Sequence, residues 1–161
     1  MSSSHEQYIK YKNWDGGKFL KYTKVENAYF QKALSISGIK PKSLSDILEI
    51  GFGNGNFLGF ASQHYNNVVG IEANPLLVEK ATKNKISAFQ SFNELNKQRF
   101  DLIVAFDVVE HLTLDELSNF FSEMAAHLAD NGAMILRFPN GDSPFGRINQ
   151  HGDITHKATI G

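Results

Sequence analysis

The chain has 161 residues, of which 42% are hydrophobic and 20% charged, with 16 basic and 17 acidic side chains. These proportions describe one domain that can bury a core, and they exclude a chain too charged to collapse. The absence of cysteine excludes a disulfide scaffold, a thiolate metal site and a cysteine nucleophile. The sequence has no apolar run long enough for a spanning helix and no secretion signal, so we expect a soluble, cytoplasmic protein.

The charge is unevenly distributed along the chain. Residues 1–42 hold eight lysines and three acidic side chains, whereas the remainder holds eight basic and fourteen acidic ones. We therefore expect residues 1–42 to form a basic, aromatic arm and helix that caps the site, and residues 43–161 to form the core. The basic front indicates either an anionic partner or a solvated lysine face on a surface helix.

The N-terminal part is predicted to contain one amphipathic helix. Tyr8, Tyr11 and Trp14 lie among polar residues without periodicity, which is typical of a lid or arm. Residues 18–37 then show apolar side chains at helical spacing, and Gly38 ends the pattern.

Five short apolar runs follow, and we interpret them as strands. Several lack strict alternation, as expected for strands covered on both faces, which indicates a parallel sheet with helices on either side. Right-handed crossovers make such a sheet doubly wound, an α/β fold. The predicted strands are residues 46–50, 67–71, 86–89, 101–106 and 133–138.

Helices are predicted between these strands. The clearest begins at Thr113, which forms a capping box with Glu116, and it continues to Leu128 before Asn131 and Gly132 stop it. The weaker patterns are residues 57–64 and 75–83, with 92–99 as a short turn or helix.

The most informative stretch is a glycine-rich turn after the first predicted strand, with glycines at positions 51, 53 and 55. Glycine permits both a sharp strand-to-helix turn and the close approach of a ligand. The dinucleotide fingerprint would need a further glycine where Asn56 or Leu58 stands, and no P-loop lysine closes the turn. Nicotinamide and P-loop nucleotide binding are therefore disfavoured.

Two carboxylates accompany the turn. Glu49 precedes the first glycine by two positions, and Glu72 follows the next strand, where its two oxygens match the vicinal hydroxyls of a ribose. With these residues the sequence resembles the class I S-adenosylmethionine-dependent methyltransferases over about residues 44–140. The segments that carry the resemblance, in the family's order, are residues 49–55, 69–74, 100–112 and 128–136.

The resemblance implies a Rossmann-like, mostly parallel sheet and S-adenosylmethionine as cofactor, released as S-adenosylhomocysteine. It places Glu49 near the amino end of the cofactor and Glu72 on the ribose hydroxyls. Many family members hold the adenine amine with an acidic residue just after the third strand, where this chain has Gln90 and Ser91. The cofactor residues that the resemblance implies are Glu49, Gly51, Phe52, Gly53, Asn54, Gly55, Glu72, Ala73, Ser91, Phe92, Phe106, Asp107 and Val108.

Methylation of an alcohol usually needs a general base or a metal ion. Because loops beyond the carboxyl ends of parallel strands surround the ligand crevice, we predict His151 or His156 as the base, with Asp153 orienting it. Alternatively, Asp153 merely caps a following helix. These three residues lack a fourth obvious ligand, so no metal is predicted. Glu110 and His111 are interpreted as structural.

The acceptor is predicted from two segments near the end of the chain. Residues 106–109 lack the Asn-Pro-Pro-aromatic motif of methyltransferases that modify base or amide nitrogens, which disfavours those acceptors. Residues 140–143 and 152–157 resemble the acceptor side of bacterial polysaccharide and lipopolysaccharide methyltransferases. This resemblance implies a sugar hydroxyl or a phosphate-bearing glycan, and no recognition motif supports a nucleic-acid partner.

The family's sheet has seven strands, so this chain is expected to lack the last two and to be a fragment or a minimal form. The fifth strand would then be an exposed edge that promotes self-association. Two alternative functions stay open: a domain that binds the cofactor without turnover, and an NAD-dependent oxidoreductase on a similar fold.

Overall fold

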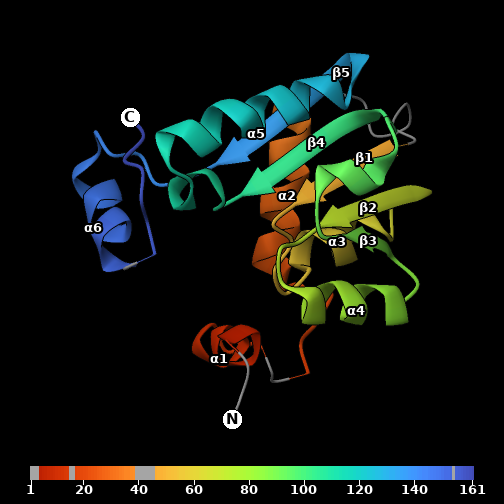
Figure 1. The fold of residues 1–161 in the computed structure, drawn as a ribbon, viewed down its shortest axis with the longest axis horizontal. Helices are drawn as coiled ribbons and strands as arrows, with labels where there is room; N and C mark the ends of the chain where they lie inside the picture. The colour runs from red at the N-terminus through yellow and green to blue at the C-terminus, as the bar shows by residue number, and fades with distance from the viewer. Residues whose placement is uncertain (1–3, 15–16, 39–45, 154) are drawn as a thin grey trace.

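Five parallel strands form one sheet in the order β3-β2-β1-β4-β5 (Figure 1). The computed structural model describes residues 4–14, 17–38, 46–153 and 155–161, so the predicted boundary between residues 42 and 43 lies outside the described residues. The predicted doubly wound α/β fold is confirmed. The strands are β1 (Asp46–Ile50), β2 (Asn67–Ile71), β3 (Ser87–Phe89), β4 (Phe100–Phe106) and β5 (Leu128–Arg137).

Helices cover both faces of this sheet. The elements α2, α3 and α4 pack on one face, and α5 with the short 3-10 helix η2 packs on the other. The helices are α1 (Ser4–Tyr11), α2 (Lys24–Ile36), α3 (Asn56–Ala61), α4 (Pro75–Lys83), α5 (Leu114–Ala126) and α6 (Pro144–Gly152), with the 3-10 helices η2 (Phe92–Leu95) and η3 (Val109–His111).

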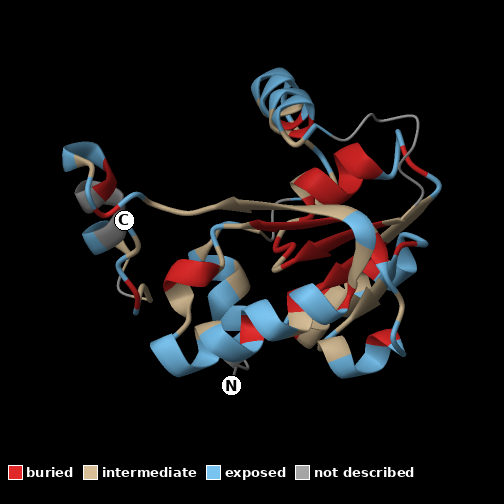
Figure 2. Ribbon diagram, turned by 90° about the horizontal axis from the view of Figure 1, so that it is seen from above, coloured by how far each residue is buried: buried red, intermediate tan, exposed pale blue. Residues whose placement is uncertain are grey.

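The middle strands read as continuous apolar runs because both of their faces are buried. In β1, Ile47 packs with Phe57 of α3, whereas the next residue, Leu48, packs with Met124 of α5 on the opposite face. Figure 2 shows the buried residues concentrated in these strands and in α3, whereas β5 is half-buried along most of its length. The core therefore fixes β1 and β4, whose carboxyl ends carry the predicted motifs.

Helix α2 begins later than its periodicity predicts. Thr23 forms a capping box with Glu26, so the helix starts at Lys24 rather than at residue 18. Leu20 has a positive φ of 61°, and its backbone N–H donates to the carbonyl of Asn54 in the glycine-rich turn. Residues 17–23 therefore leave the helical path to pack against that turn.

The end of α5 and the start of β5 also differ from the prediction. The helix ends at Ala126, and Asn131 and Gly132 lie inside β5 rather than forming a helix stop. Leu128 pairs with Phe100 of β4, with a register shift immediately afterwards. Pairing with the neighbouring strand thus overrides the local turn signal, as tertiary contacts often do.

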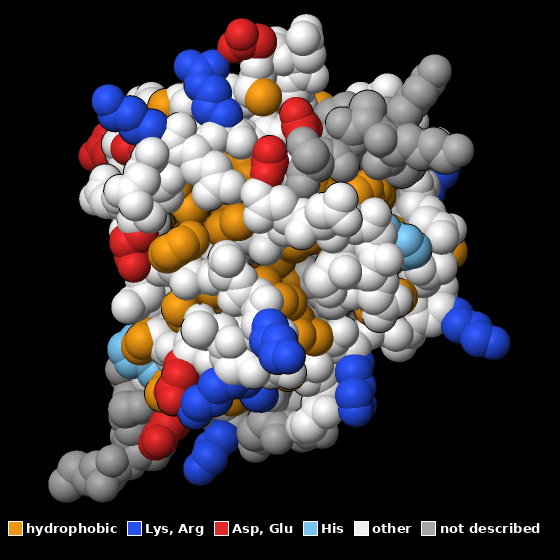
Figure 3. Space-filling view, turned by 90° about the vertical axis from the view of Figure 1, so that its right-hand side faces the viewer, with side chains coloured by type: hydrophobic (Ala, Val, Ile, Leu, Met, Phe, Trp, Pro, Cys, Tyr) orange, Lys and Arg blue, Asp and Glu red, His pale blue; other side chains and the backbone are white. Residues whose placement is uncertain are grey.

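On the face drawn in Figure 3, Lys and Arg side chains gather mainly in the lower half, with acidic side chains beside them at the lower left and further acidic side chains near the top. None of the helices in the described part of the chain combines the length with the apolar character that a membrane crossing demands.

Candidate functional site

The glycine-rich turn connects β1 to α3 and lines a cleft at the carboxyl ends of the strands. Gly51, Gly53 and Gly55 have positive φ angles of 68°, 51° and 73°, which residues with a Cβ rarely adopt. A Cβ on Gly53 would lie 2.7 Å from the indole ring of Trp14. The turn therefore needs glycine both for its backbone and for the ring that packs on it.

Glu72 follows β2 and holds this turn in place. Its Oε2 accepts a hydrogen bond from the backbone N–H of Gly53 at 2.9 Å, and its Oε1 accepts one from Asn74 at 3.0 Å. The side chain is half-buried and lines the cleft. Because a carboxylate has about four lone-pair positions, Glu72 can still accept two further hydroxyl donors.

Glu49 in β1 is a buried carboxylate that also lines the cleft. Within the described residues its Oε2 has no hydrogen-bond partner. Burial raises the pKa of Glu49 well above its ordinary value, against the lowering effect of a hydrogen bond from the backbone of Leu58. A buried, unpartnered carboxyl group is costly, so this position suits a cationic ligand group.

Replacing Glu49 with glutamine is expected to remove a pH-dependent loss of stability. In the unfolded chain this carboxyl ionises near 4.5, whereas the folded protein resists ionisation. The stability of the wild type should therefore fall, relative to Glu49→Gln, as the pH rises from about 4.5 through the folded pKa. Urea unfolding measures the free energy of unfolding of both proteins. We expect Glu49→Gln to exceed the wild type by about 1–3 kcal/mol at pH 8 and to equal it at pH 4.

Glu79→Gln, a change on the exposed face of α4, is the matched control for this experiment. Equal pH profiles for the wild type and Glu49→Gln would contradict the assignment of a raised pKa to Glu49.

Two aromatic side chains from the N-terminal residues pack over the glycine-rich turn. Trp14 lies against Gly53, and the ring of Tyr8 packs edge-on to Trp14 with ring centres 5.7 Å apart. Lys80 of α4 donates a hydrogen bond to the carbonyl of Trp14 at 3.3 Å. Tyr8, Lys12 and Trp14 line the cleft, and Tyr8 and Tyr11 lie in a short helix, α1, that their spacing did not predict.

The segment after α6 lines another part of the cleft. Asp153 accepts hydrogen bonds from the backbone N–H and the hydroxyl of Thr155 at 2.9 Å and 2.5 Å, and from Lys12 at 2.9 Å. The hydrogen bonds from Thr155 and then from Lys12 lower the pKa of Asp153, so it is charged at neutral pH. The pair between Lys12 and Asp153 joins the arm to the C-terminal segment.

His111 and His156 pack together in this part of the cleft, with ring centres 4.7 Å apart. Nδ1 of His111 lies 3.2 Å from the carbonyl oxygen of Thr155. Oδ2 of Asp153 lies 4.0 Å from Nε2 of His156, which is an ion-pair distance rather than a hydrogen bond. Asp153 follows α6, and within the described residues no helix begins after it that it could cap.

Arg137 brings a cation into the cleft from the end of β5. Its Nε donates to Oδ1 of Asp107 at 3.0 Å, and its guanidinium lies 4.7 Å from the centre of the Phe106 ring. Asp107 has a positive φ of 57°, which is uncommon outside glycine. The carboxylate of Asp107 is therefore engaged by Arg137.

These groups share one cleft of about 1430 Å³, which is large enough for a nucleoside-sized ligand and an acceptor. All of the predicted cofactor residues line it except Gly55, which is buried against Leu20. Of the predicted base residues, His156 and Asp153 line it, whereas His151 is exposed in α6 and does not.

The sequence analysis missed several residues that line this cleft. Arg137, Glu26 and Asn56 carried no motif, and only the folded chain brings them to the strand ends. Glu110 and His111 were interpreted as structural although they lie inside the motif of residues 100–112. A carboxylate and an imidazole within that motif, just after a strand end, were the available signal.

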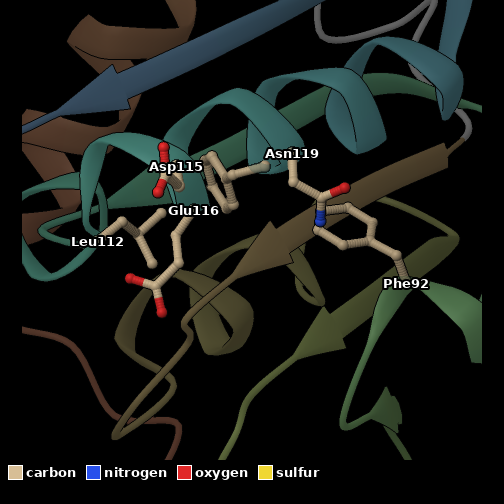
Figure 4. A pocket seen from close by; sticks show the side chains of 6 residues that line it. Phe92, Leu112, Asp115, Glu116 and Asn119 are labelled. Carbon is tan, nitrogen blue, oxygen red and sulfur yellow. The ribbon is translucent and has the colours of Figure 1, made fainter.

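A smaller hollow of about 460 Å³ opens between η2 and the start of α5 (Figure 4). Phe92, Leu112 and Phe120 line both this hollow and the main cleft. The hollow is therefore a lateral extension of the cleft, with the carboxylates of Asp115 and Glu116 at its rim.

A family of sequences described as a methyltransferase domain matches residues 22–158. Solved structures match the fold at low sequence identity. A SAM-dependent methyltransferase from Archaeoglobus fulgidus gives a TM-score of 0.73 at 20% identity, over 98% of this chain and 68% of that one. The N-methyltransferase NodS from Bradyrhizobium japonicum, in complex with S-adenosyl-L-homocysteine, gives 0.67 at 20% identity, over 90% of this chain and 77% of that one.

A third structure, an S-adenosylmethionine-dependent methyltransferase from Clostridium acetobutylicum, gives a TM-score of 0.61 at 18% identity, over 84% of this chain and 56% of that one. The chain thus spans between 56% and 77% of the length of these proteins. At such identities the likeness concerns the fold. A search of curated proteins finds no match.

Proposed function

The chain belongs to the methyltransferase-domain family, and from this premise we propose that it binds S-adenosylmethionine in the cleft and transfers the methyl group to a hydroxyl of a sugar or another small molecule. The family match confirms the predicted enzyme class. Two structural neighbours are described as S-adenosylmethionine-dependent, which supports the cofactor part of the proposal.

The observation that carries the proposal is the arrangement of Glu72 and Glu49 around a turn without Cβ atoms. Glu72 would accept the ribose hydroxyls, and Glu49 would face the amino end of the cofactor, where an ammonium group would stabilise its buried charge. The adenine would lie beside Ala73, Ser91 and Phe92, and Val108 would border the sulfonium.

The methyl group passes directly from sulfur to the acceptor, so the protein forms no covalent bond in the proposed reaction. The acceptor oxygen bonds to the methyl carbon as the carbon–sulfur bond breaks, and the electron pair of that bond returns to the sulfur. Because the sulfonium is already a good leaving group, the chain mainly supplies alignment and a dry cleft. Trp14 and Tyr8 over the turn suit the exclusion of water.

The arm residues in the cleft support a sugar acceptor. Tyr8, Trp14 and Lys12 line it, and aromatic faces pack against sugar rings while a lysine attracts phosphate. Tyr11 and Lys10, which composition grouped with them, do not line the cleft. The proposal of a sugar or a phosphate-bearing glycan therefore rests on three of the predicted arm residues.

An acceptor hydroxyl also needs a group that promotes the loss of its proton. Among the predicted bases, His156 is the histidine in the cleft, and charged Asp153 lies within ion-pair distance of it. His151, exposed in α6, would reach an acceptor only if that helix moved.

An acceptor screen tests the proposal. The chain is incubated with S-adenosylmethionine and a panel of free sugars, sugar nucleotides and sugar phosphates, with amino sugars as a separate arm, and S-adenosylhomocysteine is measured by mass spectrometry. We expect product with a hydroxyl acceptor. Product with amino sugars alone would move the acceptor to nitrogen, and tight cofactor binding with no product in any arm would favour the alternative of a binding domain without turnover.

Self-association through β5 is part of the same proposal. Within the described residues β5 pairs with β4 alone, and Met134, Ile135 and Leu136 stay half-exposed on it. An unpaired apolar edge promotes association. Light scattering should therefore give a mass above that of one chain, falling when Ile135→Lys is introduced, and a monodisperse monomer at high concentration would contradict the prediction.

A further inference from the structure

Glu110, His111 and His156 gather where η3 meets the segment after α6. One ligand-capable atom from each residue lies within 4.8 Å of the other two. The backbone N–H groups of Lys157 and Ala158 donate to the carbonyl of Glu110 at 2.7 Å and 3.1 Å, which holds the two segments together. The cluster thus joins the neighbouring residues Glu110 and His111 to His156, which lies far along the chain, and backbone hydrogen bonds hold the two segments.

Glu110 carries a carboxylate with too few partners. The residue is 1% exposed, and within the described residues its Oε2 has no hydrogen-bond partner although it lines the cleft. Burial raises the pKa of Glu110. A carboxylate in such a position is stable when it is paired or when it coordinates a metal.

His111 is oriented as a metal-bound histidine would be. Its Nδ1 lies 3.2 Å from the carbonyl oxygen of Thr155, which only accepts, so Nδ1 carries the proton and Nε2 keeps its lone pair. The hydroxyl of Thr155 donates in turn to Asp153 at 2.5 Å. Outer groups of this kind fix the tautomer and the ring orientation of ligating histidines.

Three cationic side chains around the cluster are already paired. Lys12 binds Asp153 at 2.9 Å, Arg137 binds Asp107 at 3.0 Å, and Lys157 binds Glu116 at 3.4 Å. Among the described residues no ion pair is formed by Glu110, so its charge is not cancelled by a side chain of the protein. A bound cation would cancel it.

From this geometry we propose that Glu110, His111 and His156 bind one divalent transition-metal ion of the zinc type, whose open positions take the acceptor hydroxyl. Two imidazoles and one carboxylate suit such an ion, and catalytic sites with three protein ligands keep a position open. Because zinc holds nitrogen and oxygen ligands at about 2.0–2.2 Å, they lie within roughly 4.4 Å of one another. Small rotations of these three side chains would therefore bring their ligand atoms from within 4.8 Å of one another to the separation that zinc requires.

The acceptor part of this inference rests on the proposed function, whereas the metal site does not. In this arrangement His156 is a ligand rather than the base. The metal lowers the pKa of the bound hydroxyl, whose proton leaves to solvent water before the oxygen attacks the methyl carbon. The sequence analysis predicted no metal because it considered His156 with His151 and Asp153, and the folded chain replaces these two with Glu110 and His111.

Calorimetric titration of Zn²⁺ into the tag-free chain, previously freed of metal by a chelator, tests the site. We expect saturable binding of one ion per chain with a micromolar or tighter dissociation constant. Glu110→Gln, His111→Gln and His156→Gln should each weaken it by at least about 100-fold, since loss of even an outer-shell group costs 10–100-fold. His64→Gln, an exposed histidine at the end of α3, is the control that should bind Zn²⁺ like the wild type.

Titration of the same samples with S-adenosylhomocysteine separates this inference from the proposed function and shows which variants are folded. Cofactor binding without saturable Zn²⁺ binding would overturn the metal site and leave the proposed function standing. Undiminished Zn²⁺ binding by the folded variants would overturn it as well. Zn²⁺ binding that the control keeps, and that the three variants lose while their circular dichroism spectra stay those of the wild type, would support the site whether or not the cofactor binds.

Discussion

Replacing Glu72 with alanine is expected to weaken the binding of S-adenosylhomocysteine by about 100-fold or more. If Glu72 accepts the ribose hydroxyls as we propose, the variant loses two charge-assisted hydrogen bonds, each worth about 1.5–3 kcal/mol. It also loses the bonds that Glu72 makes to the backbone of Gly53 and Asn74, which position the turn. Isothermal titration calorimetry of the wild type and the variant measures the change directly.

Two further variants isolate the cause of this loss. Glu79→Ala, on the exposed side of α4, removes a carboxylate outside the cleft and should leave the affinity unchanged. Glu72→Gln keeps the side-chain volume and one acceptor oxygen, so its affinity should fall between those of the wild type and Glu72→Ala. An affinity of Glu72→Ala within threefold of the wild type would remove Glu72 from the cofactor site.

Replacing His156 with alanine is expected to lower turnover by about 10²–10⁴-fold, the usual contribution of a general base. The same loss is expected if His156 is a metal ligand, because both roles promote the departure of the acceptor proton. The cofactor affinity should stay within about threefold, since the predicted ribose and amino contacts belong to Glu72 and Glu49. Turnover and calorimetry on the same sample measure both quantities.

His151→Ala is the informative comparison, because sequence alone did not distinguish the two histidines. His151 is exposed and lies outside the cleft, so its variant should retain full turnover. The reverse result, with turnover lost in His151→Ala and kept in His156→Ala, would place the base in α6. Turnover equal to that of the wild type in both variants would show that neither histidine serves the reaction.

The parts of the fold that local sequence determines were predictable. The strands β1 and β2 have their predicted bounds, because their apolar runs are short, and β1 also ends just before Gly51, whose φ is positive. Helix α4 also has its predicted bounds, since Asn74 caps it and Pro75 opens it. The glycine-rich turn followed from the same logic, because Gly51, Gly53 and Gly55 have left-handed backbone angles.

The parts that long-range contacts determine were not predictable. The start of β5 depends on pairing between Leu128 and Phe100. Residues 17–23 leave the helical path because they pack on the glycine-rich turn. In each case the local pattern is satisfied equally well by the predicted and the observed structure, and a partner distant in sequence decides between them.

The candidate site divides in the same way. The predicted cofactor side consists of motifs within a few residues of the strand ends, and the structure brings all of its residues except Gly55 to the lining of the cleft. The acceptor side depends on contacts such as the pair between Lys12 and Asp153, which are 141 positions apart. No local pattern reports such a pair, so the roles of Lys12, Arg137 and His111 emerge only from the folded chain.

The central claim is that the cleft binds S-adenosylmethionine through Glu72 and the glycine-rich turn. Calorimetric titration of the purified chain with S-adenosylhomocysteine, beside NADH as the competing ligand, tests it most directly. The account predicts micromolar binding of S-adenosylhomocysteine by the wild type, none of comparable strength by Glu72→Ala, and no binding of NADH. Binding of NADH without S-adenosylhomocysteine, or binding that is indifferent to Glu72, would contradict it.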